Sequence, residues 1–204
     1  MRKIKAGLLA CLLLPLVAQA DGISSLKKFY AETRSMRADF YQIVTDKQGR
    51  KVQEVYGQMQ LQRPNKFRWD YNKPFEQQII SDGKQVWLYD TELAQVTVRE
   101  LGKALGSSPA ALLAGEDGLD KNFKLTNAYR KDNMDWVSTN PVDSDVGFNK
   151  ISLGFKADKL QEMDLVDSFG HETRIVFSKI EQNTVFDGKT FLFKPPKGVD
   201  VVGE

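Results

Sequence analysis

The hydrophobic pattern changes from a helical period to a period of two within the first forty residues of the chain. Residues 22–33 place apolar side chains on one stripe and charged side chains opposite, as an amphipathic helix does, and Asp21 or Ser24 can cap its start. From Ala38 to Gln42 apolar and polar positions alternate. That alternation is typical of a strand with one buried face. We therefore expect one helix followed by a strand.

The clearest alternation lies on two consecutive segments that flank the turn at Pro64-Asn65. Their polar positions share one face, and the other face carries Val55, Gly57, Met59, Leu61, Phe67, Trp69 and Tyr71. This pattern predicts two antiparallel strands with a large apolar face. The pattern leaves two interpretations open, because such a face is either ordinary core or the wall of a cavity that holds an apolar ligand.

Short segments with the composition of strands continue along the rest of the chain, broken by turns such as Asp82-Gly83. We expect further strands at 77–81, 85–90, 93–98, 123–128, 134–139, 150–155, 160–166, 171–181 and 190–194. Between them, residues 101–105 and 110–114 follow a helical period, and Ser107-Ser108-Pro109 forms a helix start.

These segments amount to about eleven strands and three helices in one domain, a mainly β member of the α+β class. Many short strands and few helices favour a strongly curved antiparallel sheet, an unclosed barrel. In that case the helices form a plug or lid over its concave face. In an ordinary α+β core they would pack across a flatter sheet, and the pattern does not decide between the two.

The first twenty residues have the composition of a secretory signal peptide. Arg2, Lys3 and Lys5 precede an apolar run over residues 6–18, and Ala-Gln-Ala at 18–20 suits signal peptidase. The run is shorter than the roughly 20 residues that span a bilayer. We expect cleavage after Ala20 and a mature domain of residues 21–204. The alternative is cleavage before Cys11, which would leave a lipid-anchored protein.

Charge and cysteine content exclude several classes of protein. The chain has 204 residues, with 29 Lys and Arg and 27 Asp and Glu, and three of the basic residues lie in the first five positions. The remainder is slightly acidic, unlike a nucleic-acid binder. The only cysteine is Cys11. The expected mature domain therefore has no disulfide and no thiolate metal site.

Enzyme signatures are mostly absent from the sequence. His171 is the only histidine, so a metal site with two histidines is excluded, and a Ser-His-Asp triad would depend on this residue. It follows Gly170, where we expect a solvated turn. Asp143-Ser144-Asp145 is interpreted as an acidic surface turn, not a calcium loop. We expect no enzyme and no cofactor, and a hydrolase that uses buried carboxylates stays as the alternative.

Arg63 is the next position on the apolar face after Leu61. An arginine at a strand end usually lies at the rim in solvent. If its side chain points inward instead, its five donors need acceptors, and the nearest source would be the carbonyl groups of a lid.

Three motifs of the chain resemble the periplasmic outer-membrane lipoprotein carrier family, LolA. They are Arg63-Pro64-Asn65-Lys66-Phe67-Arg68-Trp69, then Ser81-Asp82-Gly83-Lys84 before Val86-Trp87-Leu88-Tyr89, and the ending Phe193-Lys194-Pro195-Pro196-Lys197-Gly198-Val199-Asp200. The segment from Ala38 to Gln42 also fits the family's first strand.

The resemblance implies a monomeric periplasmic chaperone with an unclosed barrel and a helical lid over an apolar cavity. Its ligands would be the acyl chains of lipoproteins, received from an inner-membrane ABC transporter and passed to the outer-membrane acceptor LolB. Arg63 matches the arginine that closes the lid. Ala110 stands where a bulky apolar residue can occur, so Leu113 is the better candidate for lipid contact in the lid. The expected acyl-chain residues are Val55, Met59, Leu61, Phe67, Trp69, Tyr71, Leu105 and Leu113.

Two related functions remain as alternatives. A protein of the same fold that is cleaved before Cys11 would itself be the anchored acceptor, and a periplasmic sensor would bind lipid or peptide without transporting it.

Overall fold

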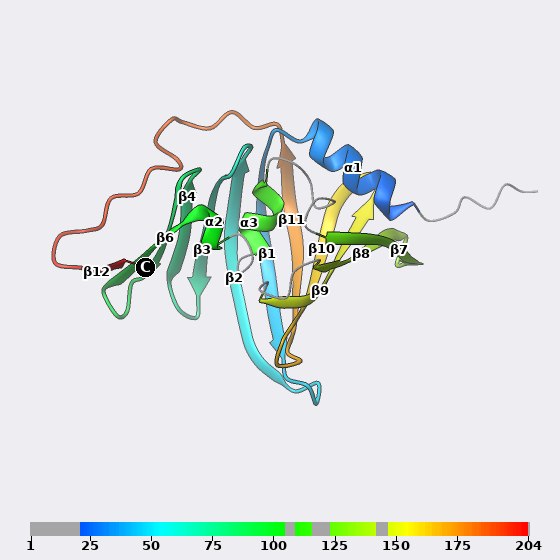
Figure 1. Ribbon diagram of the computed structural model, residues 1–204, viewed down its shortest axis with the longest axis horizontal. Helices are drawn as coiled ribbons and strands as arrows, with labels where there is room; N and C mark the ends of the chain where they lie inside the picture. The colour runs from blue at the N-terminus through cyan, green and yellow to red at the C-terminus, as the bar shows by residue number, and fades with distance from the viewer. Residues whose placement is uncertain (1–20, 105–108, 116–122, 142–146, 204) are drawn as a thin grey trace, which may run out of the picture.

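The computed structural model describes residues 21–104, 109–115, 123–141 and 147–203 of the chain (Figure 1). The expected signal peptide, Leu105, the start signal at Ser107-Ser108 and the acidic turn at Asp143-Ser144-Asp145 lie outside these residues.

The described strands form one sheet in the order β12-β6-β5-β4-β3-β2-β1-β11-β10-β9-β8-β7. Neighbouring strands are antiparallel, apart from β12, which runs parallel to β6. Their bounds are β1 Ser35–Thr45, β2 Lys51–Gln62, β3 Lys66–Lys73, β4 Gln77–Asp82, β5 Gln85–Asp90, β6 Gln95–Glu100, β7 Phe123–Lys131, β8 Met134–Pro141, β9 Phe148–Lys156, β10 Lys159–Asp167, β11 Glu172–Gln182 and β12 Asp200–Gly203.

The sheet is strongly twisted and stays open. In Figure 1, β7 to β9 lie across the direction of β1 and β2, and the two edge strands, β12 and β7, are at opposite sides of the molecule. The mainly β class and the unclosed sheet agree with the sequence prediction.

Three helical segments cover one face of this sheet. Helix α1 (Gly22–Glu32) packs on β7 to β10, α2 (Leu101–Ala104) follows β6, and α3 (Pro109–Ala114) lies over β2 and β3 (Figure 1). Only α1 and α3 exceed a single turn, because α2 has four residues. The expected three helices are thus two helices and one isolated turn, and α1 covers a different part of the sheet from α3.

The end of the chain differs from the prediction. Residues 190–194, expected to form a strand, make turns in which the Thr190 and Leu192 amides donate to the Asp187 and Lys189 carbonyls. The segment then crosses from β11 to β6 (Figure 1), and its prolines lack the N–H groups that a ladder needs. Pairing resumes only at β12, a strand that was not expected. The described sheet has twelve strands, where we expected about eleven.

The hydrophobic core lies between the concave face of the sheet and the helices. The inward positions of β2 and β3 are paired across the ladder, Met59 with Trp69 and Leu61 with Phe67. Gly57 occupies an inward position because the Phe40 ring lies over it, so that a Cβ would come 2.5 Å from that ring. Phe40 in turn contacts the Trp69 ring, with centroids 4.7 Å apart.

Candidate functional site

The apolar residues predicted to contact a ligand form the centre of the core. Six of them are at most 3 % exposed and belong to one buried cluster: Val55, Met59, Leu61, Phe67, Trp69 and Leu113. Tyr71 packs against the same cluster, and burial raises the pKa of its phenol to about 12. These side chains pack against each other, and α3 lies over β2 and β3, which carry all of them except Leu113.

Arg63 connects the sheet to α3. Its Nη1 donates a hydrogen bond of 2.9 Å to the carbonyl oxygen of Leu113. The guanidinium carbon lies 4.1 Å from the centre of the Tyr30 ring and 5.0 Å from that of Phe29, both on α1. Of the two orientations left open by the sequence, the structure therefore has the inward one, with a lid carbonyl as acceptor.

The guanidinium of Arg63 is only partly satisfied. Nε and Nη2 are buried and have no hydrogen-bond partner among the described residues. Burial lowers the pKa of Arg63, and Arg34 lowers it further, while Tyr30 acts in the opposite direction. Arginine remains protonated under these conditions. A charged group with spare donors is thus held beneath the lid by one hydrogen bond and two aromatic rings.

Two further contacts hold the same end of α3. The Tyr30 hydroxyl donates to the Leu112 carbonyl at 2.6 Å, and the Asn65 amide donates to the Ala114 carbonyl at 2.9 Å. Together with Arg63 they satisfy three successive carbonyl groups where the helix leaves its last acceptors without intrahelical donors. The pattern of residues 22–33 predicts the helix that carries Tyr30 and gives no sign of this contact with α3.

The described part of α3 places several side chains in the core. Leu113, the lid residue expected to contact lipid, is fully buried, and Leu112 beside it is 6 % exposed. Leu112 lies in the predicted helix but was not among the expected acyl-chain residues. Ala110 is 3 % exposed, so this small side chain also faces the core.

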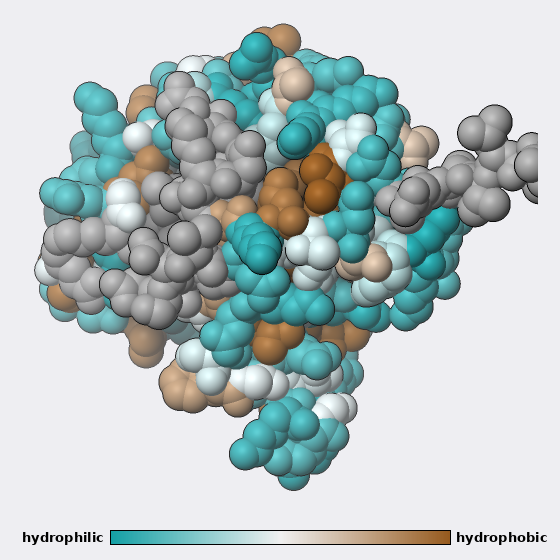
Figure 2. All heavy atoms as spheres, turned by 45° about the vertical axis from the view of Figure 1, so that its right-hand side comes forward, coloured by the Kyte–Doolittle hydropathy of each residue, from teal (hydrophilic) through white to brown (hydrophobic). Residues whose placement is uncertain are grey.

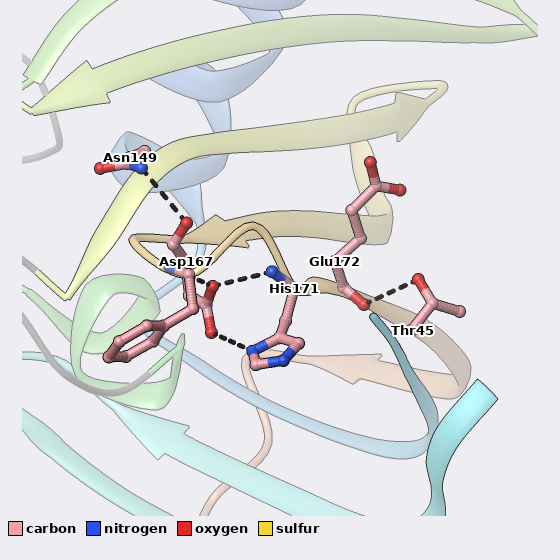
Figure 3. A network of polar contacts seen from close by, with 6 residues as sticks. Thr45, Asn149, Asp167, His171 and Glu172 are labelled. Carbon is pink, nitrogen blue, oxygen red and sulfur yellow. Dashed lines mark hydrogen bonds and ion pairs between the residues drawn. The ribbon is translucent and has the colours of Figure 1, made fainter. Parts of the chain in front are cut away.

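His171 lies in the turn between β10 and β11, as expected, and its contacts stabilise that turn (Figure 3). Its Nδ1 is 2.8 Å from Oδ2 of Asp167, whose Oδ1 accepts the amides of Phe169 and His171. The Asp167 carbonyl accepts from Asn149, and the Glu172 carbonyl from Thr45, which links the turn to β9 and β1. No serine belongs to the network drawn in Figure 3, so the network is no hydrolytic triad.

Other kinds of site have little support on the surface of the protein. In the part of the chain that the structure describes, no three His, Cys, Asp or Glu residues lie close enough to hold a metal ion. None of the described helices is long and apolar enough to cross a membrane. On the face shown in Figure 2, hydrophobic residues form small separate patches among hydrophilic ones. The apolar residues of β2 and β3 that were expected to contact a ligand are buried, and α3 lies over these two strands.

Comparisons with known proteins agree with this arrangement. The family described as "Outer membrane lipoprotein carrier protein LolA" matches residues 31–194. An outer-membrane lipoprotein carrier protein of Methylobacillus flagellatus is 54 % identical over 98 % of this chain and 97 % of its own. A protein of the same name from Dechloromonas aromatica is 48 % identical over 94 % and 92 %.

Solved structures show the same fold at low sequence identity. An uncharacterized conserved protein from Thermus thermophilus matches with a TM-score of 0.53 and 14 % identity, over 89 % of this chain and 96 % of that one. The match supports the fold alone, whereas the sequence relatives share nearly the full length of the chain. The chain thus belongs to the outer-membrane lipoprotein carrier family, LolA.

Proposed function

We propose that this protein is a periplasmic chaperone that binds the acyl chains of lipoproteins and carries them to the outer membrane. The observation that carries the proposal is the Arg63 contact with α3. A short helix covers the apolar residues of β2 and β3, and a hydrogen bond from a partly satisfied arginine holds it there. The names of the relatives and the family match support the same function.

The energetics of the ligand explain why a carrier needs such a lid. Each methylene that leaves water contributes about 0.8 kcal/mol, so three acyl chains with some forty methylenes amount to roughly 30 kcal/mol. The strongest non-covalent binding free energies reach only about 20 kcal/mol. A lipoprotein therefore needs shielding during transit, and a carrier that retained the whole hydrophobic gain would not release it.

In this proposal the structure with α3 on the sheet is the closed, empty form, and its contacts oppose the binding of acyl chains. Acyl chains that enter between α3 and the sheet displace Leu113 and break the hydrogen bond from Arg63 to its carbonyl group. Loading thus loses contacts that unloading restores, and the cycle needs no nucleotide, for which the sequence has no P-loop. Under this proposal the acyl chains contact the seven described cavity residues, Val55, Met59, Leu61, Phe67, Trp69, Tyr71 and Leu113, and α2 and α3 move as the lid.

The partners follow from the same proposal. The protein receives its ligand from an inner-membrane ABC transporter and delivers it to the acceptor LolB. It acts as a monomer. The expected cleavage after Ala20 leaves it without an anchor, and the mass of the mature N-terminus distinguishes this from cleavage before Cys11.

Replacement of Arg63 tests the function and its mechanism together. We expect Arg63→Leu to copurify with acylated proteins from an envelope extract at least as well as wild type, because the closed form has lost the hydrogen bond that holds α3 on the sheet. Transfer to the acceptor should fall, because unloading no longer restores the hydrogen bond to Leu113. Arg68→Gln is the matched control, since Arg68 lies on the outward face of β3 and pairs with Asp70.

Two results would contradict the proposal. Normal transfer by Arg63→Leu would show that the hydrogen bond from Arg63 to Leu113 plays no part in release. Absence of acylated protein from both wild type and variant after mild purification would refute the carrier function itself.

A further inference from the structure

A pocket of about 280 Å³ lies at the end of the core opposite Arg63. It is lined in part by Val55 and Tyr71, two of the proposed acyl-chain residues. Val55 and Arg63 are eight positions apart along one extended strand, which corresponds to about 26 Å. The apolar interior therefore has the contact between Arg63 and α3 at one end and this pocket at the other.

The charged groups of the pocket are all acceptors. Glu76, Asp90 and Glu92 contribute carboxylates, and no lysine or arginine is among the lining residues. Gln42, which also lines the pocket, is 8 % exposed, and its Oε1 has no hydrogen-bond donor among the described residues. A buried acceptor without a donor is unfavourable, so a ligand that brings a donor stabilises this end of the core.

The shape and lining select the kind of donor. The three carboxylates do not form a metal site, since no three acidic residues of the described chain lie close enough to share an ion. Val55, Tyr71 and Phe75 give the pocket apolar walls, and Phe75 is 57 % exposed at its edge. A side chain with an apolar stem and a cationic end fits both features, as lysine and arginine do.

We propose that this pocket binds a lysine or arginine side chain of the lipoprotein, in the segment that follows its acylated residue. The inference rests on the proposed function, because it takes the acyl chains to lie along the interior. Chains that contact Val55 and Tyr71 leave their polypeptide at the mouth that these two residues share with the carboxylates. The pocket thus recognises the protein part of the ligand, and the interior its lipid part.

The test compares two acylated peptides with the same lipid. One is a tripalmitoylated Cys-Ser peptide followed by four lysines, and the other carries four Nε-acetyl-lysines in their place. Fluorescence titration of residues 21–204 should give about tenfold tighter binding of the lysine peptide at low salt, because three exposed ion pairs near the middle of their usual range together give about that factor. The preference should shrink at 0.5 M salt, where the Debye length is only about 4 to 5 Å.

Variants assign the preference to this pocket. The triple variant Glu76→Gln/Asp90→Asn/Glu92→Gln should bind both peptides equally, with unchanged affinity for the acetylated one. The control Glu32→Gln/Glu100→Gln/Glu172→Gln has the same change of charge at three exposed positions outside the pocket, and should keep the preference. Gln42→Met removes the amide oxygen at similar volume and should weaken only the lysine peptide, by a few fold.

The outcomes separate this inference from the function on which it rests. Equal binding of both peptides by wild type, or a preference that survives in the triple variant, overturns the pocket assignment and leaves the carrier function standing. Failure of both peptides to bind wild type overturns the carrier function and the pocket with it.

Discussion

Helices α1 and α3 cover the same face of one sheet, but they are attached to it in different ways. The eleven-residue α1 has its own N-cap, because the Asp21 carboxylate accepts the Ser24 amide at 2.8 Å. Its side chains reach a neighbouring hairpin, where Asp158 accepts from Ser25 and Lys28. The buried ring of Phe29 lies 6.0 Å from that of Phe155. Packing and local polar contacts hold this helix.

Helix α3 has six residues, and it is held both by packing and by contacts at its C-terminal end. Its buried core residues are Ala110, Leu112, Leu113 and Ala114. Arg63, Tyr30 and Asn65 donate to its carbonyl groups, and a guanidinium near a helix C-terminus is favoured by the helix dipole. Under the proposed function these three hydrogen bonds break when α3 moves, whereas α1 stays on the sheet.

Truncation of one buried leucine in each helix provides the strongest test of this difference. Leu26→Ala in α1 should lower the free energy of unfolding by about 2 to 5 kcal/mol, as large truncations in a fixed core do. Leu113→Ala in α3 should lower it by less, because the lid can detach before the sheet unfolds. Urea denaturation measures both. An equal loss in the two variants would show that α3 is as much a part of the cooperative core as α1.

Removal of one lid contact sharpens the comparison at a smaller scale. Tyr30→Phe deletes the hydrogen bond to Leu112 and keeps the ring beneath Arg63, so the contact should weaken by about 1 kcal/mol. Amide hydrogen exchange should become faster in α3 and stay unchanged in the middle of α1. Faster exchange in both helices would mean that they open as one unit.

The smallest effect is expected at the ion pair that ties α1 to the β9–β10 turn. Hydrogen bonds from Lys28 and Ser25 lower the pKa of Asp158 in the folded protein. A lowered pKa stabilises the folded state at any pH above the pKa of the unfolded chain, which is about 4. That stabilisation is lost as the pH falls through the pKa of the folded protein. Asp158→Asn should therefore shift the urea midpoint slightly at pH 7, and the shift should disappear once the pH has fallen below the lowered pKa of Asp158. A difference that persists in acid would indicate a structural effect of the amide.

The sequence predicted the central strands well because their faces differ in polarity. Alternation placed Val55, Met59 and Leu61 on the buried face, and the structure confirms all three as core. It also placed Gln42 inward, where the structure has it buried beside Val55, its partner across the ladder. The alternation shows that such a polar residue points inward but does not show what it contacts, because its neighbours in space lie far away in the sequence.

What the sequence left open or predicted wrongly depends on contacts between distant segments. The direction of Arg63 depends on a carbonyl group fifty residues later, so no local pattern decides it. Residues 190–194 have the composition of a strand, yet they pair with none of the described strands as the chain crosses to β6. Strand β12 has four exposed residues and no alternation of burial, so its pairing with β6 leaves no signal in the sequence.

That parallel pairing also decides which strand forms one edge of the sheet. Without residues 200–203, β6 would be the edge strand, and an exposed edge offers unpaired N–H and C=O groups to other copies of the chain. With them, the edge is the four-residue β12, and a very short edge strand offers fewer such groups. Changes in residues 200–203 that weaken this pairing should therefore increase aggregation more than they lower the stability of the rest of the sheet.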